Sequence, residues 1–367
     1  MKILQVVKFY YPQIGGVEKI VQQISEGLNP EDDFNVSVLC CNKGKENRKD
    51  VISGVSVISA SSFGVFWGMP VSLIFFRLFR KLIKENDVID YHYPFPLIDL
   101  AIFLFKPKNK LIVHYHSDIV RQRILNFLIK PLTLNTLKKA DKIIVSNPNI
   151  VKSSPYLSRF KEKCEIIPFG VNFQKIEKVN EDQTQKIKNK YKDFILFVGR
   201  LNYYKGVRYL VRAMKNVNSN LVIIGEGQQE NFLRREVERL KIKEKVFFLP
   251  FVKTEELISF YKTCKVFVLP SIFKSEAFGI VLIEAMACGA PLISTELGTG
   301  TSFVNKNKTT GFVVSPRNEE ELSSAINKII DNKKMAQEMR VNSIERAKEL
   351  FSLEGMIQKT KKVYENL

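Results

Sequence analysis

Hydrophobic and polar positions alternate along this 367-residue chain in two recurring patterns. Short apolar runs typical of buried strands are followed by longer segments in which apolar residues recur at helical spacing. In the first half, a helix is predicted over 17–28, and the predicted strands are 3–7, 35–40, 55–58, 87–92, 111–115, 142–146 and 164–168. This βαβ order predicts a parallel sheet covered by helices.

The second half repeats the pattern after a polar stretch, 174–193, that is rich in Lys, Gln, Glu and Asn. Its predicted strands are 194–199, 221–225, 246–250, 266–270 and 291–294. We therefore expect two doubly wound α/β domains, 1–173 and 193–349, joined near 173–192. Ligands of such sheets bind beyond the carboxyl ends of the strands, which places the expected site in a cleft between the two domains.

Composition agrees with two globular domains, because 45% hydrophobic residues are enough for two cores. Lys2 is followed by a short strand, so no leader is expected. The most apolar stretch, 63–76, is broken by Pro70 and ended by Arg77, which makes it too short to span a bilayer. Five cysteines that form neither CxxC pairs nor a disulfide framework favour free thiols in a cytoplasmic protein, and three histidines without a Cys/His cluster predict no zinc site.

The net charge of +19 favours an anionic partner, namely nucleic acid, acidic lipid or a nucleotide. Residues 77–163 hold 17 Lys and Arg against 7 Asp and Glu. Within them, one helical face carries a basic stripe beside the aromatic residues Phe75, Phe76 and Phe79: Arg77, Arg80, Lys81 and Lys84. An anionic membrane surface and the solvated edge of a buried helix fit this stripe equally well. No nucleic-acid-binding motif is found, so nucleic acid ranks below the membrane.

The segment 275–295, SEAFGIVLIEAMACGAPLIST, carries the strongest functional signal. It follows the predicted strand 266–270 and contains a predicted helix from about 279 to 288. Glu276 therefore falls in the strand-to-helix loop, and Glu284 falls within the helix. Carboxylate oxygens accept hydrogen bonds from sugar hydroxyls, so both residues are candidate sugar ligands.

The start of that helix is a candidate anion site. The backbone N–H groups of Phe278, Gly279 and Ile280 lie there. The first N–H groups of a helix have no acceptor within it, and its dipole is positive at this end. One loop is thus suited to a diphosphate and to sugar rings.

Two other loops carry phosphate-binding chemistry. Gly15 and Gly16 precede the first helix and permit close approach of a ligand to the backbone. Their pattern is not G-x-G-x-x-G, so a dinucleotide site gains no support. Arg200 and Lys205, in FVGRLNYYKG, follow the first strand of the second half and offer a planar fork and a point charge to a diphosphate.

A candidate histidine lies in LIVHYHSDIVRQ, residues 111–122. His116 comes just past the end of a predicted strand, where site residues are expected. His114 is interpreted as structural. Asp118 could orient His116 or cap the following helix, and the cap is preferred.

Together these segments resemble the retaining glycosyltransferases of family 4, with their E-x7-E signature and GT-B fold. The resemblance covers nearly the whole chain, since its motifs run from residue 9 to 295 and include 167–174, 225–230 and 250–257. It implies two Rossmann-like domains facing a cleft. It also implies a C-terminal helix, about 350–367, that packs back on the first domain.

The resemblance also implies roles for the candidate residues. Arg200 and Lys205 would hold the leaving nucleoside diphosphate, and His116 would contact the donor sugar. Glu276 would hold sugar hydroxyls and Glu284 the ribose. The loop at Gly15 and Gly16 would face the donor phosphate and the acceptor, and the loop at Gly225 would lie near the nucleoside. No metal or other cofactor is expected, and no Asp-x-Asp metal motif is found in the sequence.

The string 275–305, with YYKG and YHSDIVRQ, resembles bacterial O-antigen α-mannosyltransferases that use GDP-mannose. We therefore expect a cytoplasmic enzyme, peripheral at the inner face of the membrane, that transfers mannose to a polyprenyl-diphosphate-linked oligosaccharide. A UDP-hexose or UDP-N-acetylhexosamine donor is the first alternative. A phosphorylase or epimerase of the same fold would not need the basic apolar face at 73–84. A non-catalytic nucleotide- or lipid-binding protein is disfavoured by intact His116, Arg200, Lys205 and Glu276.

Overall fold

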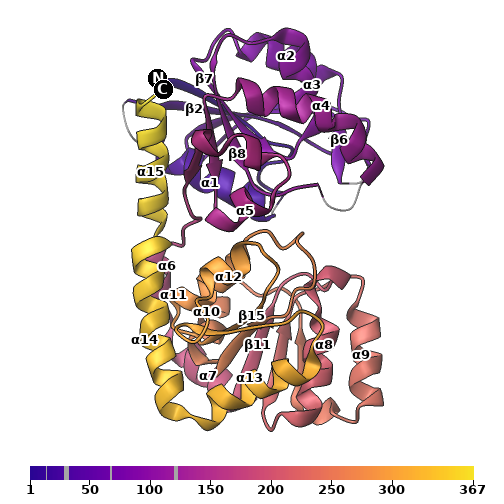
Figure 1. The fold of residues 1–367 in the computed structure, drawn as a ribbon, viewed down its shortest axis with the longest axis vertical. Helices are drawn as coiled ribbons and strands as arrows, with labels where there is room; N and C mark the ends of the chain where they lie inside the picture. Colours follow the sequence, from indigo (N-terminus) through magenta and orange to yellow (C-terminus); the bar gives the residue numbers. More distant parts are fainter. Residues whose placement is uncertain (14, 29–32, 67, 120–122) are drawn as a thin grey trace. The chain divides into compact units, whose positions relative to one another are not determined.

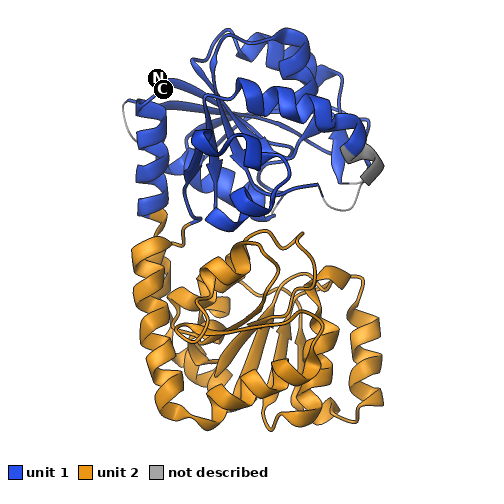
Figure 2. Ribbon diagram, in the orientation of Figure 1, with its two compact units in different colours: residues 1–169, 354–367 blue, residues 170–353 orange. Residues whose placement is uncertain are grey.

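The computed structural model describes residues 1–13, 15–28, 33–66, 68–119 and 123–367. The chain forms two compact units, coloured separately in Figure 2. Unit 1 comprises Met1–Phe169 and Glu354–Leu367, and unit 2 comprises Gly170–Leu353. Each unit is built around its own sheet with helices packed on it, so the expected pair of doubly wound α/β domains is confirmed (Figure 1).

Unit 1 holds an eight-stranded sheet in the order β10-β9-β8-β7-β1-β2-β4-β3. All neighbouring strands pair in parallel except β3 and β4, which are antiparallel. The strands are β1 Lys2–Val6, β2 Asn35–Cys41, β3 Arg48–Ile52, β4 Val55–Ala60, β7 Val88–Tyr93, β8 Lys110–Tyr115, β9 Lys142–Val145 and β10 Cys164–Ile166. The pattern did not predict β3, because this edge strand is mostly exposed and has no apolar run.

The remaining elements of unit 1 are mainly helical. They are α1 Gly16–Leu28, α2 Ile74–Leu82, α3 Pro96–Phe105, α4 Arg123–Lys139, α5 Pro148–Ser153, α15 Leu353–Glu365, and the short hairpin β5 Gly64–Phe66 with β6 Met69–Val71. The C-terminal helix α15 is part of this unit: Tyr364 is fully buried and hydrogen-bonds to Asp90 of β7. None of the helices that the structure describes has the length and apolar character needed to cross a bilayer.

Unit 2 holds a six-stranded parallel sheet in the order β13-β12-β11-β14-β15-β16. The strands are β11 Phe194–Val198, β12 Asn220–Ile224, β13 Val246–Leu249, β14 Val266–Leu269, β15 Leu292–Thr295 and β16 Gly311–Val314. The strand order reverses between β11 and β14, and in unit 1 it reverses between β1 and β7. In doubly wound sheets, ligands bind at this reversal, beyond the carboxyl ends of the strands.

Helices cover the sheet of unit 2, with α8, α9 and α13 packed together in one group and α7, α10, α11 and α14 in another (Figure 1). The helices are α6 Phe173–Glu177, α7 Glu181–Tyr191, α8 Val207–Ala213, α9 Glu230–Arg239, α10 Thr254–Thr263, α11 Ile280–Ala287, α12 Gly300–Val304, α13 Glu319–Asp331 and α14 Lys333–Leu350.

The polar stretch expected to join the domains forms two of these helices, α6 and α7. Asn172 and Asn180 cap them by accepting hydrogen bonds from the backbone N–H groups of Lys175 and Gln183. Few apolar side chains of α7 are buried, so apolar residues do not recur at clear helical spacing along it. For this reason the hydrophobic pattern of the sequence indicated only a polar connection.

Candidate functional site

An ion pair lies where the strand order of unit 2 reverses. Lys205 ends a short 3-10 turn, Tyr203–Lys205, after β11, and Glu276 lies in the loop after β14. The Nζ atom of Lys205 is 2.6 Å from Oε2 of Glu276, and both residues are buried. Two motifs that the sequence presents separately therefore meet at the carboxyl edge of the sheet.

Backbone contact between the two loops makes this meeting possible. Gly206 has a φ of +66°, and a Cβ atom there would lie 2.1 Å from the carbonyl oxygen of Pro270. A residue other than glycine would push the loop after β11 away from the loop after β14.

The charges of the site are unequal. Burial by itself lowers the pKa of the Lys205 amine, but the Glu276 carboxylate raises it above its ordinary value, so the amine stays charged. Arg200 is exposed near the start of the same loop, and its charge acts on Lys205 in the opposite sense. The charged amine of Lys205, with the Arg200 guanidinium in the same loop, favours an anionic ligand at this edge of the sheet.

Hydroxyl groups fix the position of Glu276. Ser271 donates to Oε2 of Glu276 at 3.0 Å, and Thr299 donates to its carbonyl oxygen at 2.8 Å. The N–H of Gly300 donates to the carbonyl of Ala277 at 2.8 Å. The GTGT turn at 298–301 therefore holds the loop. Sequence reasoning missed Ser271 and Thr299, although both follow strand ends.

Helix α11 begins directly after this loop. Gly279 precedes its first residue, Ile280, with a φ of +82°. The N–H groups of Phe278, Gly279 and Ile280 therefore lie at a helix start, as expected from the sequence. Glu284 lies one turn further along, is half-buried, and accepts a hydrogen bond from the Tyr261 hydroxyl at 3.2 Å.

A hollow of about 150 Å³ opens at the carboxyl ends of β12 and β13. It is lined by Gly225, Glu226, Glu230, Arg234, Phe248, Leu249 and Pro250. The guanidinium of Arg234 lies 4.5 Å from the centre of the Phe248 ring and pairs with Glu230 at 2.8 Å. The segment 225–230, which the resemblance places near the nucleoside, and Pro250, the first residue of the segment 250–257, thus meet at one hollow.

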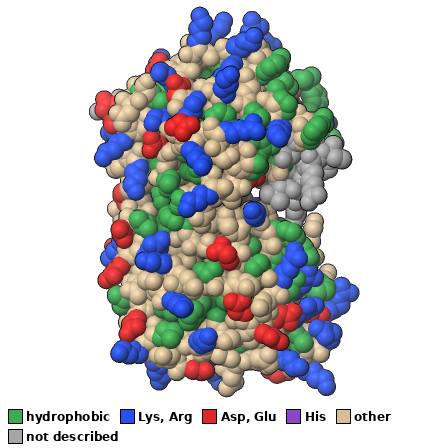
Figure 3. Space-filling view, viewed as in Figure 1, with side chains coloured by type: hydrophobic (Ala, Val, Ile, Leu, Met, Phe, Trp, Pro, Cys, Tyr) green, Lys and Arg blue, Asp and Glu red, His purple; other side chains and the backbone are tan. Residues whose placement is uncertain are grey.

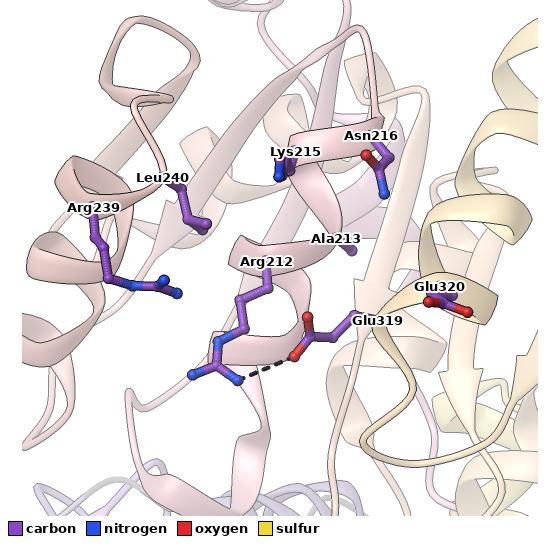
Figure 4. A pocket seen from close by; sticks show the side chains of 8 residues that line it. All are labelled: Arg212, Ala213, Lys215, Asn216, Arg239, Leu240, Glu319 and Glu320. Carbon is purple, nitrogen blue, oxygen red and sulfur yellow. Dashed lines mark hydrogen bonds and ion pairs between the residues drawn. The ribbon is translucent and has the colours of Figure 1, made fainter.

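A larger hollow of about 320 Å³ lies among the last turns of α8 and α9 and the first turn of α13 (Figure 4). Helices α8 and α9 follow parallel strands and run back toward the opposite edge of the sheet, so their last turns, and the hollow beside them, lie away from the ion pair. Arg212 in it is already paired with Glu236 and Glu319. The charge of Arg212 is thus already compensated within the protein, and we assign this hollow no ligand.

In unit 1, His116 directly follows β8 and lies beside the other two histidines of the chain. The rings of His92 and His114 stack at 4.6 Å, and those of His92 and His116 at 5.2 Å. His116 is buried, and its pKa falls to about 3, first through burial and then through the charges of His114 and Lys8. It is therefore neutral at physiological pH.

The sequence showed no cluster of metal ligands, but the fold brings Asp90, His92 and His114 together, with ligand atoms within 4.8 Å of one another. Both ring nitrogens of His92 are already within hydrogen-bond distance of Gln5 and His116. A cation would therefore have to displace an existing hydrogen bond, and this donor set does not suit a resident metal.

Two other expectations concern residues of unit 1. Asp118 accepts hydrogen bonds from the hydroxyls of Tyr115 and Ser154, not from His116. The helix cap expected of Asp118 involves 120–122, outside the described residues.

The carboxyl group of Glu18 lies close to Gly15. A Cβ atom on this glycine would be 2.2 Å from Oε2 of Glu18. This loop therefore presents an acceptor, which suits a sugar hydroxyl better than a phosphate.

Comparison with known protein families gives two adjoining matches. The model "Glycosyltransferase Family 4" matches residues 14–175, and "Glycosyl transferases group 1" matches residues 178–349.

Curated relatives match over the full length. The chain is 33% identical to O-antigen chain mannosyltransferase C of Escherichia coli, covering 100% of this chain and 99% of the relative. It is 32% identical to D-rhamnosyltransferase WbpZ of Pseudomonas aeruginosa, covering 96% and 92%. A Campylobacter jejuni relative, 28% identical over 76% of this chain and 77% of its own, is named as an N-acetylgalactosaminyltransferase acting on a diphospho-undecaprenol-linked sugar.

Solved structures share the fold. Sucrose-phosphate synthase from Thermosynechococcus elongatus superposes with a TM-score of 0.81 at 23% identity, covering 100% of this chain and 98% of that one. Anabaena Alr3699/HepE in complex with UDP gives 0.81 at 17% identity, with 100% of both chains covered.

Proposed function

This chain belongs to the family 4 glycosyltransferases and has the GT-B fold, and from that premise we propose its donor, its acceptor and its site. It transfers mannose from GDP-mannose, with retention of configuration, to an oligosaccharide on a polyprenyl diphosphate during synthesis of O-antigen or a related surface polysaccharide. The names of the E. coli and C. jejuni relatives support the mannosyl donor and the lipid diphosphate carrier, respectively.

The Lys205–Glu276 pair is the observation that carries this proposal. During transfer, the bond between the anomeric carbon and the diphosphate oxygen breaks, and negative charge develops on the phosphate. The positive groups at the reversal of the sheet are Arg200, Lys205 and the N–H groups at the start of α11. Preorganised donors of this kind stabilise such charge in the transition state. The acceptor hydroxyl bonds to the anomeric carbon, and its proton passes to the leaving phosphate.

The geometry of Glu276 suits sugar binding better than nucleophilic attack. Lys205 and Ser271 both donate to Oε2. Oε1 is therefore the oxygen offered to a sugar hydroxyl. A carboxylate neutralised by an adjacent ammonium is a weak nucleophile, so Glu276 positions the donor sugar.

The nucleoside is assigned to the hollow beside Gly225, with Glu284 accepting from the ribose hydroxyls. Glu226 and Glu230 line this hollow. Guanine presents an N1–H and an amino group side by side, which one carboxylate can accept together, whereas uracil offers a single N–H. This arrangement supports GDP over UDP.

In unit 1, His116 and the loop at Gly15 and Gly16 are assigned to the donor sugar and the acceptor.

A lipid-linked acceptor requires work at the membrane surface. The four residues of the basic stripe, Arg77, Arg80, Lys81 and Lys84, are all exposed. Phe75 and Phe79, expected beside the stripe, are fully buried in the core of unit 1 and cannot reach a lipid. Among the described residues just before α2, Phe63, Val65, Phe66, Val71 and Leu73 are exposed apolar side chains. Figure 3 shows hydrophobic side chains grouped at one edge of unit 1 with Lys and Arg nearby. We assign peripheral contact with anionic lipid at the inner face of the cytoplasmic membrane to this region.

A panel assay tests the proposal. The purified protein is incubated with GDP- and UDP-linked sugars and a polyprenyl-diphosphate-linked oligosaccharide, and release of nucleoside diphosphate and elongation of the acceptor are both measured. We expect both only with GDP-mannose and acceptor together. Elongation with a UDP-sugar would assign the alternative donor, and formation of sugar phosphate from inorganic phosphate would identify a phosphorylase. No release with any donor would refute the proposal.

A further inference from the structure

The histidine cluster of unit 1 lies on one face of the sheet. Gln5 of β1 is in register with Asp90 of β7, and His92 of β7 is in register with His114 of β8. Residues two apart on a strand point to the same face, so these side chains and that of His116 share one side of the sheet. Tyr364 of α15 is fully buried and hydrogen-bonds to Gln5 and Asp90 of this face.

The Asp90 carboxylate determines the orientation of Gln5. Oδ2 of Asp90 accepts from Nε2 of Gln5 at 3.1 Å and from the hydroxyl of Tyr364. A carboxylate offers only acceptors, so Gln5 must direct its NH₂ group to Asp90. Its carbonyl oxygen, Oε1, then faces Nε2 of His92 at 2.6 Å.

The hydrogen-bond directions follow from that orientation. Because Oε1 of Gln5 only accepts, His92 must carry a proton on Nε2. A second proton on Nδ1 would charge this ring, which is disfavoured because burial lowers the pKa of His92 well below its ordinary value. Nδ1 of His92 is therefore an acceptor, and it lies 2.9 Å from Nε2 of His116. His116 must donate from Nε2, which leaves Nδ1 without a proton.

We propose that Gln5, acting through His92, holds His116 in the tautomer with its proton on Nε2, so that Nδ1 serves as a hydrogen-bond acceptor for a ligand. This inference rests on the proposed function for the identity of that ligand, a hydroxyl group of the donor sugar. His116 would then accept from the sugar, and it would not donate to a phosphate or act as a cation. Gln5 and His92 are positioning residues in this scheme.

Nuclear magnetic resonance tests the tautomers without any substrate. All three histidines of the chain belong to this cluster, so long-range ¹H–¹⁵N spectra of ¹⁵N-histidine-labelled protein report on it alone. We expect His92 and His116 both to carry the proton on Nε2 in the wild type. A proton on Nδ1 of His116 would overturn the inference.

Two substitutions separate positioning from packing. Gln5→Met keeps the length of the side chain but removes its acceptor, so His92 and His116 should show the Nδ1–H form in part. Tyr364→Phe removes a neighbouring hydroxyl but leaves Asp90 to hold Gln5, so the tautomers should not change. Unchanged tautomers in a folded Gln5→Met would contradict the proposal, and if that variant does not fold, the wild-type spectrum decides.

Kinetics supply the second readout. Gln5→Met should lower kcat/KM for transfer about tenfold, the scale of one lost hydrogen bond. Nucleoside diphosphate affinity, measured by calorimetry, should not change, because the proposed ligands of that group are in unit 2. If the tautomers are as expected but no donor supports transfer, the proposed function fails and the tautomer assignment stands. Wild-type kcat/KM in a variant whose tautomers have changed would refute the acceptor role of His116.

Discussion

Lys205 and Glu276 are 71 positions apart in the sequence, yet Nζ of one lies 2.6 Å from Oε2 of the other in the interior of unit 2. Burying an ion pair costs the desolvation free energy of both charged groups. Removing one partner leaves the other charge buried without a counter-charge. The pair is thus a feature of the site whose energetic and catalytic roles can be measured separately.

Arg200→Ala and Lys205→Ala should each lower turnover roughly a hundredfold or more, the scale for losing one donor to a transition-state charge. The two variants should differ in stability. Arg200 is exposed, so its loss should leave the free energy of unfolding nearly unchanged. Lys205→Ala leaves the Glu276 carboxylate buried and unpaired, which should cost about 3 kcal/mol or more.

A double variant, Lys205→Ala with Glu276→Gln, is the control for that prediction. It removes both charges, so most of the lost stability should return while turnover stays low. Denaturant titration and steady-state kinetics measure the two effects. Wild-type kinetics in either single variant would refute the diphosphate role.

Glu276→Ala should impair transfer while leaving the affinity for free GDP largely intact, because its carboxylate serves the sugar. Glu284→Ala should weaken the binding of the nucleotide itself, because Glu284 is assigned to the ribose. Calorimetry with GDP and UDP on both variants compares them directly. An equal loss of nucleotide affinity in the two would contradict the division of roles.

Activity should survive EDTA. Arg200, Lys205 and the helix start at Gly279 supply positive charge for the diphosphate, so a divalent cation is not required by this chemistry. Transfer is measured before and after chelation and buffer exchange, then again with magnesium or manganese added. Loss of transfer on chelation, with recovery on adding either cation, would overturn the prediction.

Asp99 should make the stability of unit 1 depend on pH. It is fully buried, accepts a hydrogen bond from the Tyr91 hydroxyl at 2.9 Å, and burial raises its pKa from 3.8 to about 7. Between these values the folded state keeps a proton that the unfolded state has lost, so stability falls as the pH rises from about 4 to about 7.

The matched variant for this effect is Asp99→Asn, which does not titrate. The free energy of unfolding of the wild type, relative to the variant, should fall across that window by about 4 kcal/mol at most. Urea titrations at several pH values measure the difference. A difference that does not change between pH 4 and pH 7 would show that Asp99 has an ordinary pKa.

Reversing the basic stripe should largely abolish binding to anionic liposomes, since each basic residue near such a surface contributes about 1 kcal/mol, weakened by salt. The variant replaces Arg77, Arg80, Lys81 and Lys84 with Glu. Transfer to a short soluble acceptor should be retained, because these residues are not assigned to the sugar or diphosphate site. Co-sedimentation at low and high salt measures binding.

A second charge reversal controls for net charge. It replaces four exposed lysines in or just before α7 of unit 2, namely Lys178, Lys186, Lys188 and Lys190. Liposome binding should persist in this variant. Equal binding by the stripe variant and the wild type would show that the stripe is only a solvated helix face.

The sequence by itself determined the class of fold and the candidate loops. Apolar runs such as 194–198 and 266–269 form buried strands because hydrophobic spacing is a local property of the chain. Arg200, Lys205, Glu276 and His116 could be selected as candidates because polar residues in the loops that follow such strands lie at the carboxyl edge of a parallel sheet. Local periodicity was too weak to reveal the exposed strand β3 and the helix α7, which bury few apolar side chains.

Only the tertiary structure decided which of these residues meet. Strand order placed β11 beside β14, and this joined Lys205 to Glu276. The pairing of β1, β7 and β8 gathered Gln5, Asp90 and the three histidines on one face, and the return of the chain in α15 added Tyr364. Hydrophobic periodicity identifies a segment as a buried strand but is similar from one buried strand to the next, so it cannot specify neighbours. Packing of the whole core selects the strand order, and the strand order determines which polar groups become partners.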